Sequence, residues 1–216
     1  MQHRSLRQEA KSQRILDAAL TVFAQEGYSG ASMDAIALAA EVSKPTLYMY
    51  FGSKQQLFET IMMARRDEML EPLEQMSKGL VQDLLNFSWS YAETVMKPEF
   101  LSLARLIIAE AQRFPSIGRA YQQAGPNRVL RGMMAYLTQQ KKAGHLTFLD
   151  AELAAQDLWA LILSAPRNHA LHMPDDIPGR AAIARSINNG LAVYLRAYST
   201  DPRKDCTTLQ RLQSAK

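Results

Sequence analysis

The chain contains little cysteine and no long apolar run. Cys206 is the single cysteine among 216 residues, so no internal disulfide can form, and one thiol fits a reducing compartment. No stretch approaches the roughly 18 consecutive apolar residues of a membrane-spanning helix. Residues 1–20 are charged and lack the apolar core of a secretory signal peptide. We therefore expect a soluble, cytoplasmic protein that does not associate with membranes.

Sequence fingerprints of common enzymes are also missing. We find no GxSxG, HExxH, phosphate-binding loop or dinucleotide-binding motif. His169 and His172 are spaced like metal ligands, with Asp175 and Asp176 nearby, but two imidazoles without a third firm ligand do not make a zinc signature. The sequence predicts no catalytic residue, no cofactor and no metal.

The period-two alternation of β-strands is absent, whereas apolar spacings of three and four recur throughout. Hydrophobic residues make up 47% of the chain, enough to bury a sizeable core. We therefore predict an all-α fold. After residue 79, glycine and proline positions divide the chain into helices at about 80–96, 98–114, 116–124, 126–143, 150–172 and 178–198. Residues 199–216 are polar and are expected to be frayed.

Bulk charge does not single out a nucleic-acid-binding segment. The whole chain carries a formal net charge of +4. In residues 1–60 the basic residues are Arg4, Arg7, Lys11, Arg14, Lys44 and Lys54, and the acidic ones are Glu9, Asp17, Glu26, Asp34, Glu41 and Glu59, so six charges balance six. Only the positions of individual charged residues can therefore indicate a DNA-binding surface.

Capping residues mark four helices in the first part of the chain. A first helix with an apolar stripe ends near Gly27, where a left-handed cap would stop it. Ser32 is a predicted N-cap for a second, short helix. Ser43 caps a third helix, with a proline in its first turn, and Gly52 ends that helix. Ser53, with glutamine three residues later, forms the capping box of a fourth.

Two short helices joined by a tight turn indicate a helix-turn-helix, whose second helix enters the major groove with its N-terminus first. On this second helix Leu47 and Phe51 share the inward side, and Thr46, Tyr48 and Tyr50 fan outward. A tyrosine at a groove edge can donate to a phosphate while its ring packs on a sugar or a thymine methyl. The alternative is an ordinary helical hairpin with surface tyrosines.

Charged and capping groups at three helix starts extend this prediction. Lys44 begins the outward-facing helix and is placed to reach a base or a phosphate. Lys54 and Ser32 stand at helix starts, where free N–H groups favour a phosphate.

The run ILDAALTVFAQEGYSGASMDAIALAAEVSKPTLYMYFGSKQQLFETIM, residues 15–62, closely resembles the DNA-binding domain of TetR/AcrR-family transcriptional regulators. The resemblance rests on AAxxxFxxxGY, on Ala37 with Ala40, and on TLYMYF with the following SK. It implies that the residues used at DNA are Ser32, Lys44, Thr46, Tyr48, Tyr50 and Lys54. A role of Lys44 in base choice is our own inference. Arg4, Arg7 and Lys11 either form a basic arm on the DNA or belong to a solvated tail.

The resemblance also implies a division of the chain. Residues 1–56 would form the DNA-binding domain, 57–198 a larger all-α ligand-binding and dimerisation domain, and 199–216 a polar tail. Residues 100–130 look like the AefR-like subgroup of C-terminal domains. In the family the last two long helices form a four-helix dimer interface, and the many small residues on 150–172 and 178–198 permit close approach.

Candidate ligand-binding residues lie in this larger region. The helix at 100–114 is apolar nearly all round, which indicates a buried helix. Arg105 and Glu110 on it then need partners, either in a ligand pocket or on neighbouring helices. The aromatic and methionine candidates are Trp89, Tyr121, Met133 and Trp159, although for each one alone the sequence favours a plain core position.

The sequence thus predicts a homodimeric DNA-binding regulator, most simply a repressor that a small apolar or amphipathic ligand releases from a palindromic operator. One alternative is a regulator of the same type without an inducer, or an activator. A second alternative, from another class of protein, is an α-helical enzyme that uses Arg105 and Glu110.

Overall fold

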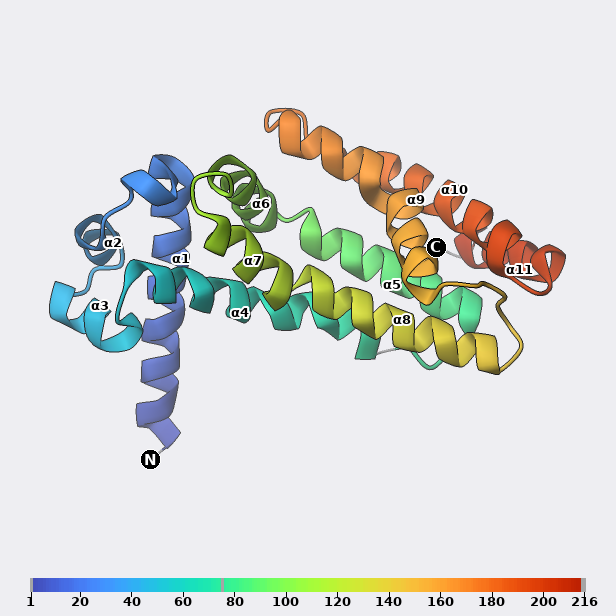
Figure 1. Ribbon diagram of the computed structural model, residues 1–216, viewed down its shortest axis with the longest axis horizontal. Coiled ribbons are helices and arrows are strands. Elements are labelled where there is room, and N and C mark those ends of the chain that lie inside the picture. The colour runs from blue at the N-terminus through green and yellow to red at the C-terminus, as the bar shows by residue number, and fades with distance from the viewer. Residues whose placement is uncertain (1, 75, 215–216) are drawn as a thin grey trace. The chain divides into compact units, whose positions relative to one another are not determined.

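The computed structural model covers the whole chain and describes residues 2–74 and 76–214, leaving out the side chains of residues 2–7, 65–72 and 74. In this part of the chain eleven α-helices follow one another (Figure 1). The described residues contain no strand, and one isolated antiparallel bridge joins Leu146 to Ser199. The all-α prediction is confirmed. The helices form two compact units, which we describe separately.

Unit 1 comprises residues 1–67 and 98–125. Its helices are α1 (Gln2–Gly30), α2 (Met33–Ala39), α3 (Lys44–Phe51), the first part of α4 (Lys54–Glu74), α6 (Pro98–Glu110) and α7 (Pro115–Ala124). Helix α1 packs against both α2 and α6, and α2 packs against α3. The compact units therefore divide the chain differently from the predicted ranges 1–56 and 57–198, which stay predictions about function.

A cluster of four aromatic rings holds unit 1 together. Tyr28 of α1 packs against Phe23, Phe58 and Phe114, with ring centroids 5.5, 5.4 and 5.4 Å away. Phe23 and Phe58 meet edge to face at 5.7 Å. Such offset and edge-on pairs add about 0.5–1.5 kcal/mol each beyond area burial. They join α1 to α4 and to the residue that precedes α7.

Helix α1 is kinked at Gly27, whose φ of 73° and ψ of 165° are not helical. The positive φ that we predicted for this glycine is confirmed, but the helix continues beyond the kink to Gly30. The positive φ favours glycine at this position, and a Cβ here would also require the Glu110 carboxylate, 2.8 Å away, to shift.

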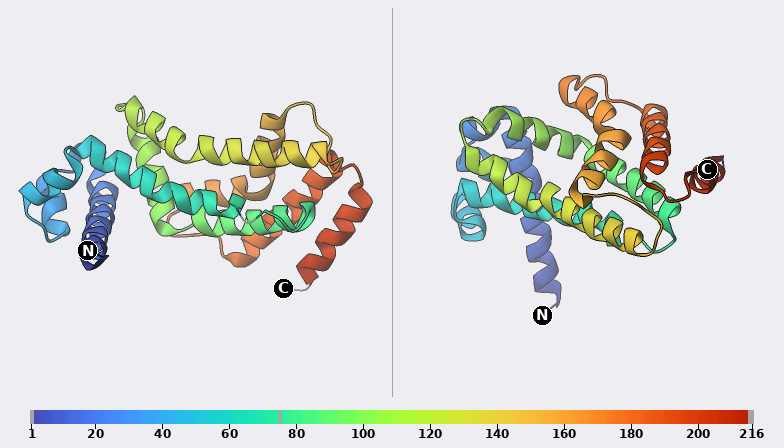
Figure 2. Two further views of the ribbon diagram at one scale, coloured as in Figure 1. Left: turned by 90° about the horizontal axis from the view of Figure 1, so that it is seen from below. Right: turned by 45° about the vertical axis from the view of Figure 1, so that its right-hand side comes forward.

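Unit 2 comprises residues 68–97 and 126–216. Its full helices are α5 (Leu80–Val95), α8 (Pro126–Lys142), α9 (Ala151–His172), α10 (Arg180–Tyr198) and α11 (Pro202–Ser214). Helix α9 lies along α8 and α10, and α10 also packs on α5 and α11. Figure 2 shows residues 143–150 as the loop between α8 and α9.

Two contacts fix the packing inside unit 2. Gly190 lets α10 approach α9 closely, because a Cβ there would lie 2.3 Å from the Leu161 carbonyl oxygen. The carboxylate of Asp83, only 2% exposed, accepts hydrogen bonds from the Lys78 backbone N–H at 2.8 Å and the Tyr136 hydroxyl at 3.0 Å. This carboxylate ties the start of α5 to α8.

Two expectations about the helices are wrong. Residues 202–214 are not frayed but form α11, since this helix buries Leu209 to 2% exposure and Asp201 accepts the Lys204 N–H at its start. Helix α6 ends at Glu110 and is not buried all round, because the Ile108 side chain is 66% exposed. The other predicted helices after residue 79 agree with the structure to within a few residues.

Within the described residues, no helix is both long enough and apolar enough to span a membrane.

Candidate nucleic-acid interface

The turn between α2 and α3 has the compact geometry of a helix-turn-helix. Ser32 caps α2, its Oγ accepting the Ala35 N–H at 3.0 Å. At the C-terminal end of α2, the Val42 N–H donates to the Ala37 carbonyl at 3.0 Å. Glu41 between them adopts a φ of 51°, the left-handed conformation that reverses the chain direction. The described link between the helices is therefore as short as the capping pattern predicts.

Helix α3 begins and ends at the residues that the sequence predicts. Ser43 Oγ accepts the Thr46 N–H at 3.3 Å and lies 2.8 Å from the Thr46 hydroxyl oxygen. Pro45 occupies the first turn, where its missing N–H leaves no carbonyl unpaired. Gly52, with a φ of 67°, ends the helix by donating its N–H to the Tyr48 carbonyl at 2.8 Å.

One face of α3 is core and the opposite face is open. Leu47 and Phe51 are buried, as predicted. Tyr48 is 43% exposed and Met49 is 75% exposed. Tyr50 is half-buried beside Phe51, with 6.0 Å between ring centroids. The predicted outward residues thus differ in kind, because Tyr48 is open whereas Tyr50 packs partly on its own domain.

Sequence reasoning missed Met49. At 100° per residue it stands almost opposite the buried Leu47 and Phe51, so it lies at the centre of the exposed face of α3. An apolar side chain suggests a core position, but the helical period alone assigns Met49 to the surface of α3. A methionine there can contact a thymine methyl without a fixed hydrogen-bond geometry.

Lys44 and Asp34 form an ion pair across the turn. Lys44 Nζ lies 2.7 Å from Asp34 Oδ1, and the two side chains are 54% and 66% exposed. The hydrogen bond to Asp34, and then its negative charge, raise the pKa of Lys44 above its usual value. Asp34 lies in the first turn of α2, and the sequence alone did not indicate its pairing with Lys44.

Lys54 has a structural role that the sequence did not indicate. Its ammonium donates to the backbone carbonyls of Tyr28 at 2.7 Å, Ser29 at 3.3 Å and Ala31 at 2.8 Å, and lies 4.8 Å from the Tyr28 ring centroid. An ammonium has three protons, so these carbonyls can engage all of them. A phosphate contact by Lys54 stays a prediction that would have to share or displace these bonds.

The basic arm is described only in part. The Lys11 ammonium lies 5.9 Å from the Tyr50 ring centroid, a cation–π contact. The side chains of Arg4 and Arg7 lie outside the described residues.

The six predicted ligand residues divide between the two units. Arg105, Glu110 and Tyr121 belong to unit 1, and Trp89, Met133 and Trp159 to unit 2. Glu110 Oε1 accepts the Ser29 N–H at 3.3 Å, beside the kink of α1. Arg105 Nη2 donates to Ser102 Oγ at 3.4 Å. These two charges lie on partly exposed side chains of α6.

In unit 2 the candidates differ in environment. Met133 is fully buried. Trp89 lies 4.4 Å under the Arg180 guanidinium and lines a groove of about 400 Å³ between α5, α10 and α11. Trp159 packs against Phe87 and Tyr91, with ring centroids 6.5 and 6.1 Å away, and its indole Nε1 is buried without a hydrogen-bond partner in the described structure.

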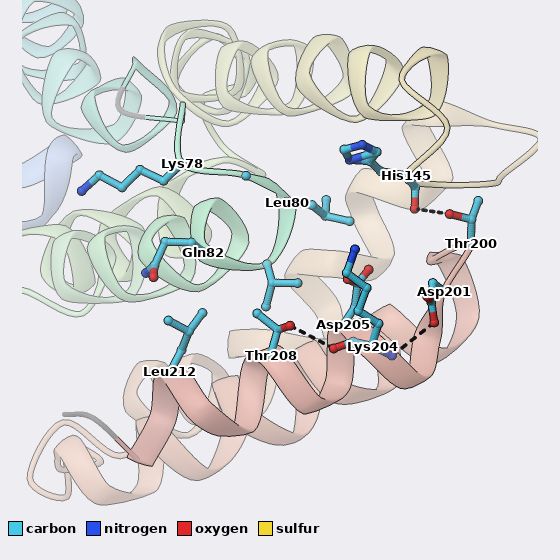
Figure 3. Close-up of a pocket in the computed structure, with 12 residues that line it drawn as sticks. Lys78, Leu80, Gln82, His145, Thr200, Asp201, Lys204, Asp205, Thr208 and Leu212 are labelled. Atoms are coloured by element: carbon cyan, nitrogen blue, oxygen red, sulfur yellow. Dashed lines mark hydrogen bonds between the residues drawn. The ribbon is translucent and has the colours of Figure 1, made fainter.

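A second groove in unit 2, of about 540 Å³, lies between the start of α5, the loop before α9 and one side of α11 (Figure 3). Its mixed lining includes Lys78, His145 and Lys204 beside apolar residues, and none of the six predicted ligand residues. His169 pairs with Asp176 at 2.9 Å, and His172 Nδ1 contacts the Asn168 carbonyl at 2.8 Å. Within the described residues no three His, Cys, Asp or Glu side chains gather as metal ligands.

Two family models match the chain. The model of bacterial regulatory proteins of the tetR family matches residues 15–61. The model of the C-terminal domain of AefR-like transcriptional repressors matches residues 82–200. The second match includes α6 and α7, which pack in unit 1 with the helices of the first.

Similar proteins agree with these matches. The flavonoid-responsive regulator FrrA is 31% identical, covering 89% of this chain and 98% of its own, with a TM-score of 0.71. A TetR-family regulator from Mesorhizobium loti is 28% identical over the same shares, with a TM-score of 0.78. The HTH-type regulator YhgD of Bacillus subtilis is 28% identical over 146 residues, which cover 65% of this chain and 74% of its own.

We predict that Lys54→Met lowers the free energy of unfolding by about 1–3 kcal/mol, because three carbonyls lose a charged donor. Lys44→Met is the matched control, since an exposed ion pair contributes about 0–1 kcal/mol. Urea unfolding followed by circular dichroism measures both. Equal stability of the two variants would contradict the structural role of Lys54.

Proposed function

The chain belongs to the TetR family of bacterial transcriptional regulators, with an AefR-like C-terminal domain, and from this premise we propose that it represses transcription by binding a palindromic operator as a homodimer. The observation that carries the proposal is the open face of α3, capped at both ends and held by Leu47 and Phe51. Two copies related by a twofold axis would present two such faces to two half-sites.

The contacts follow from the position of each side chain. Tyr48 and Met49 would meet bases and sugars in the major groove, since they are the exposed large hydrophobic side chains of α3. Lys44 and Thr46 would lie at the end of α3 that enters the groove first. Ser32 would donate its hydroxyl to a phosphate at the start of α2, because its oxygen already accepts the cap bond. Tyr50 and Lys54 would contact DNA mainly at the edge of this interface, since both side chains already have contacts within unit 1.

Selection from a random-duplex library tests the DNA-binding proposal. The enriched sequence should contain two inverted half-sites. Tyr48→Ala should weaken binding to this duplex about tenfold by removing ring and hydroxyl contacts, and Tyr48→Phe should separate the two contributions. Fluorescence anisotropy measures the affinities. Selection of no common sequence, or full affinity in Tyr48→Ala, would refute the assigned contact surface.

The homodimer would form through α9 and α10. Leu153 of α9 and Val193 of α10 are exposed apolar side chains, and Leu161, Ala165 and Ala182 of the same two helices line a depression. Small residues let helices from a second copy approach closely, as in a four-helix bundle.

A single substitution tests this interface better than a truncation, because α10 supplies core residues such as Tyr194. We expect Ala165→Arg to give folded monomers, since the exposed alanine would be replaced by a long charged side chain in the interface. Ala143→Arg, on an exposed alanine after α8, should remain a dimer. Analytical ultracentrifugation distinguishes the two, and a dimeric Ala165→Arg protein would overturn the interface.

The effector would be an aromatic small molecule that bears hydrogen-bond acceptors. In the ring cluster, Tyr91 and Trp159 are partly exposed and could stack on a ligand, with the buried Phe87 behind them, and the buried indole N–H of Trp159 is a donor that such a molecule would satisfy. The flavonoid response of the relative FrrA points to the same chemical class. Binding would release DNA to the extent that the ligand prefers the conformation without DNA.

Thermal unfolding with the flavonoid naringenin tests this class. Saturating ligand should raise the unfolding temperature of the wild-type protein and of Trp89→Phe, whereas Trp159→Phe should lose most of the shift because the indole donor is gone. No shift across a panel of flavonoids, or an undiminished shift in Trp159→Phe, would refute the site.

A further inference from the structure

Asp34 stands beside the part of α3 that the proposed function brings to DNA. It lies in the first turn of α2, and its carboxylate is 2.7 Å from the Lys44 ammonium at the first residue of α3. Both side chains are largely exposed, so the pair is accessible to a docking duplex. A carboxylate at this position repels phosphates and therefore does not add to general affinity for DNA.

The neighbouring lysines are engaged elsewhere. The Lys54 ammonium is held by three carbonyls, and the Lys11 ammonium lies over the Tyr50 ring. Lys44 is thus the described lysine of unit 1 that both begins α3 and projects from an exposed position. Asp34 partly neutralises this cation.

The Lys44–Asp34 ion pair makes a contact of Lys44 with a phosphate less favourable than a contact with a base edge. If Lys44 turns to a phosphate, it leaves the Asp34 carboxylate unpaired beside a row of negative charges, whatever the base sequence. A base edge carries no net charge, and the O6 and N7 atoms of guanine are acceptors for lysine. Because an ammonium has three protons, Lys44 can donate to such a base while it remains bonded to Asp34.

We propose that Asp34 is a specificity-determining residue, which positions Lys44 for a base edge with guanine-type acceptors and lowers the affinity for DNA of arbitrary sequence. This inference rests on the proposed DNA-binding function. Asp34 acts through Lys44 and need not touch the DNA itself.

The experiment compares the wild-type protein with Asp34→Asn on two labelled duplexes of equal length, the duplex enriched by selection and one of mixed sequence. Asp34→Asn should bind the mixed duplex about two- to fivefold more tightly, the range of an exposed ion pair, and gain less on the selected duplex. The salt dependence on the mixed duplex should steepen by up to about one phosphate contact, because Lys44 is freed. The ratio of the two affinities therefore falls.

Three further variants separate the ion pair from simpler effects. Glu26→Gln makes the same charge change on an exposed residue of α1, outside α2 and α3, and should leave the ratio unchanged. Asp34→Glu should keep the wild-type ratio. In a Lys44→Gln background, Asp34→Asn should have no further effect on the ratio, whereas a role of Asp34 in stabilising the start of α2 would persist.

An unchanged ratio in Asp34→Asn, or an equal change in Glu26→Gln, would overturn the role of Asp34 while leaving the DNA-binding proposal intact. Failure of the wild-type protein to prefer the selected duplex over the mixed one would instead contradict the proposed function, and this inference with it.

Discussion

The ammonium of Lys54 lies where three segments of unit 1 meet, and the placement of α3 depends on it. The carbonyls of Tyr28, Ser29 and Ala31 lie beyond the kink of α1, where regular helix bonding ends. A helix end leaves such carbonyls without intrahelical partners, and a cation is their most favourable one. The lysine that supplies it is the first residue of α4, directly after the turn that ends α3. The kink, the start of α4 and the end of α3 are thereby fixed together.

Helix α6 also contacts the segment that follows the kink of α1, through Glu110. Glu110 accepts the Ser29 N–H, so the carbonyls of Tyr28, Ser29 and Ala31 face a cation while an N–H of the same segment faces an anion. The residues of α6 belong to the AefR-like match, yet they pack with the helices of the tetR-family match. Because the AefR-like match extends into unit 1, the ligand response that we propose would reach the position of α3 through α6.

The interface that results contains few unengaged lysines. Lys11, Lys44 and Lys54 each have a partner within unit 1, while the exposed centre of α3 carries Tyr48 and Met49. Affinity for DNA would then depend more on close packing in the groove than on a general positive field. This arrangement agrees with the balance of six basic and six acidic residues in the first sixty.

Local signals predicted most of this region, because capping residues and helical periods act over three or four positions. Ser32, Ser43 and Gly52 begin or end helices as the sequence indicates. The partners of Lys54 and Glu110 lie 23–26 and 81 positions away, and nothing local specifies them. Helix α11 was missed because polar composition outweighed the apolar period that buries Leu209. Asp34 and Lys44 were both noticed, but their pairing depends on how α2 and α3 cross.

The most direct test of the account is photo-crosslinking from the centre of the exposed face of α3. A photoreactive amino acid in place of Met49 should crosslink to bases within both half-sites of the selected duplex, because this side chain would enter the major groove. The same amino acid in place of Met63, an exposed methionine of α4, serves as the matched control and should give little crosslinking. Crosslinks of equal yield at both positions, or none at position 49, would contradict the claim that α3 reads DNA through this face.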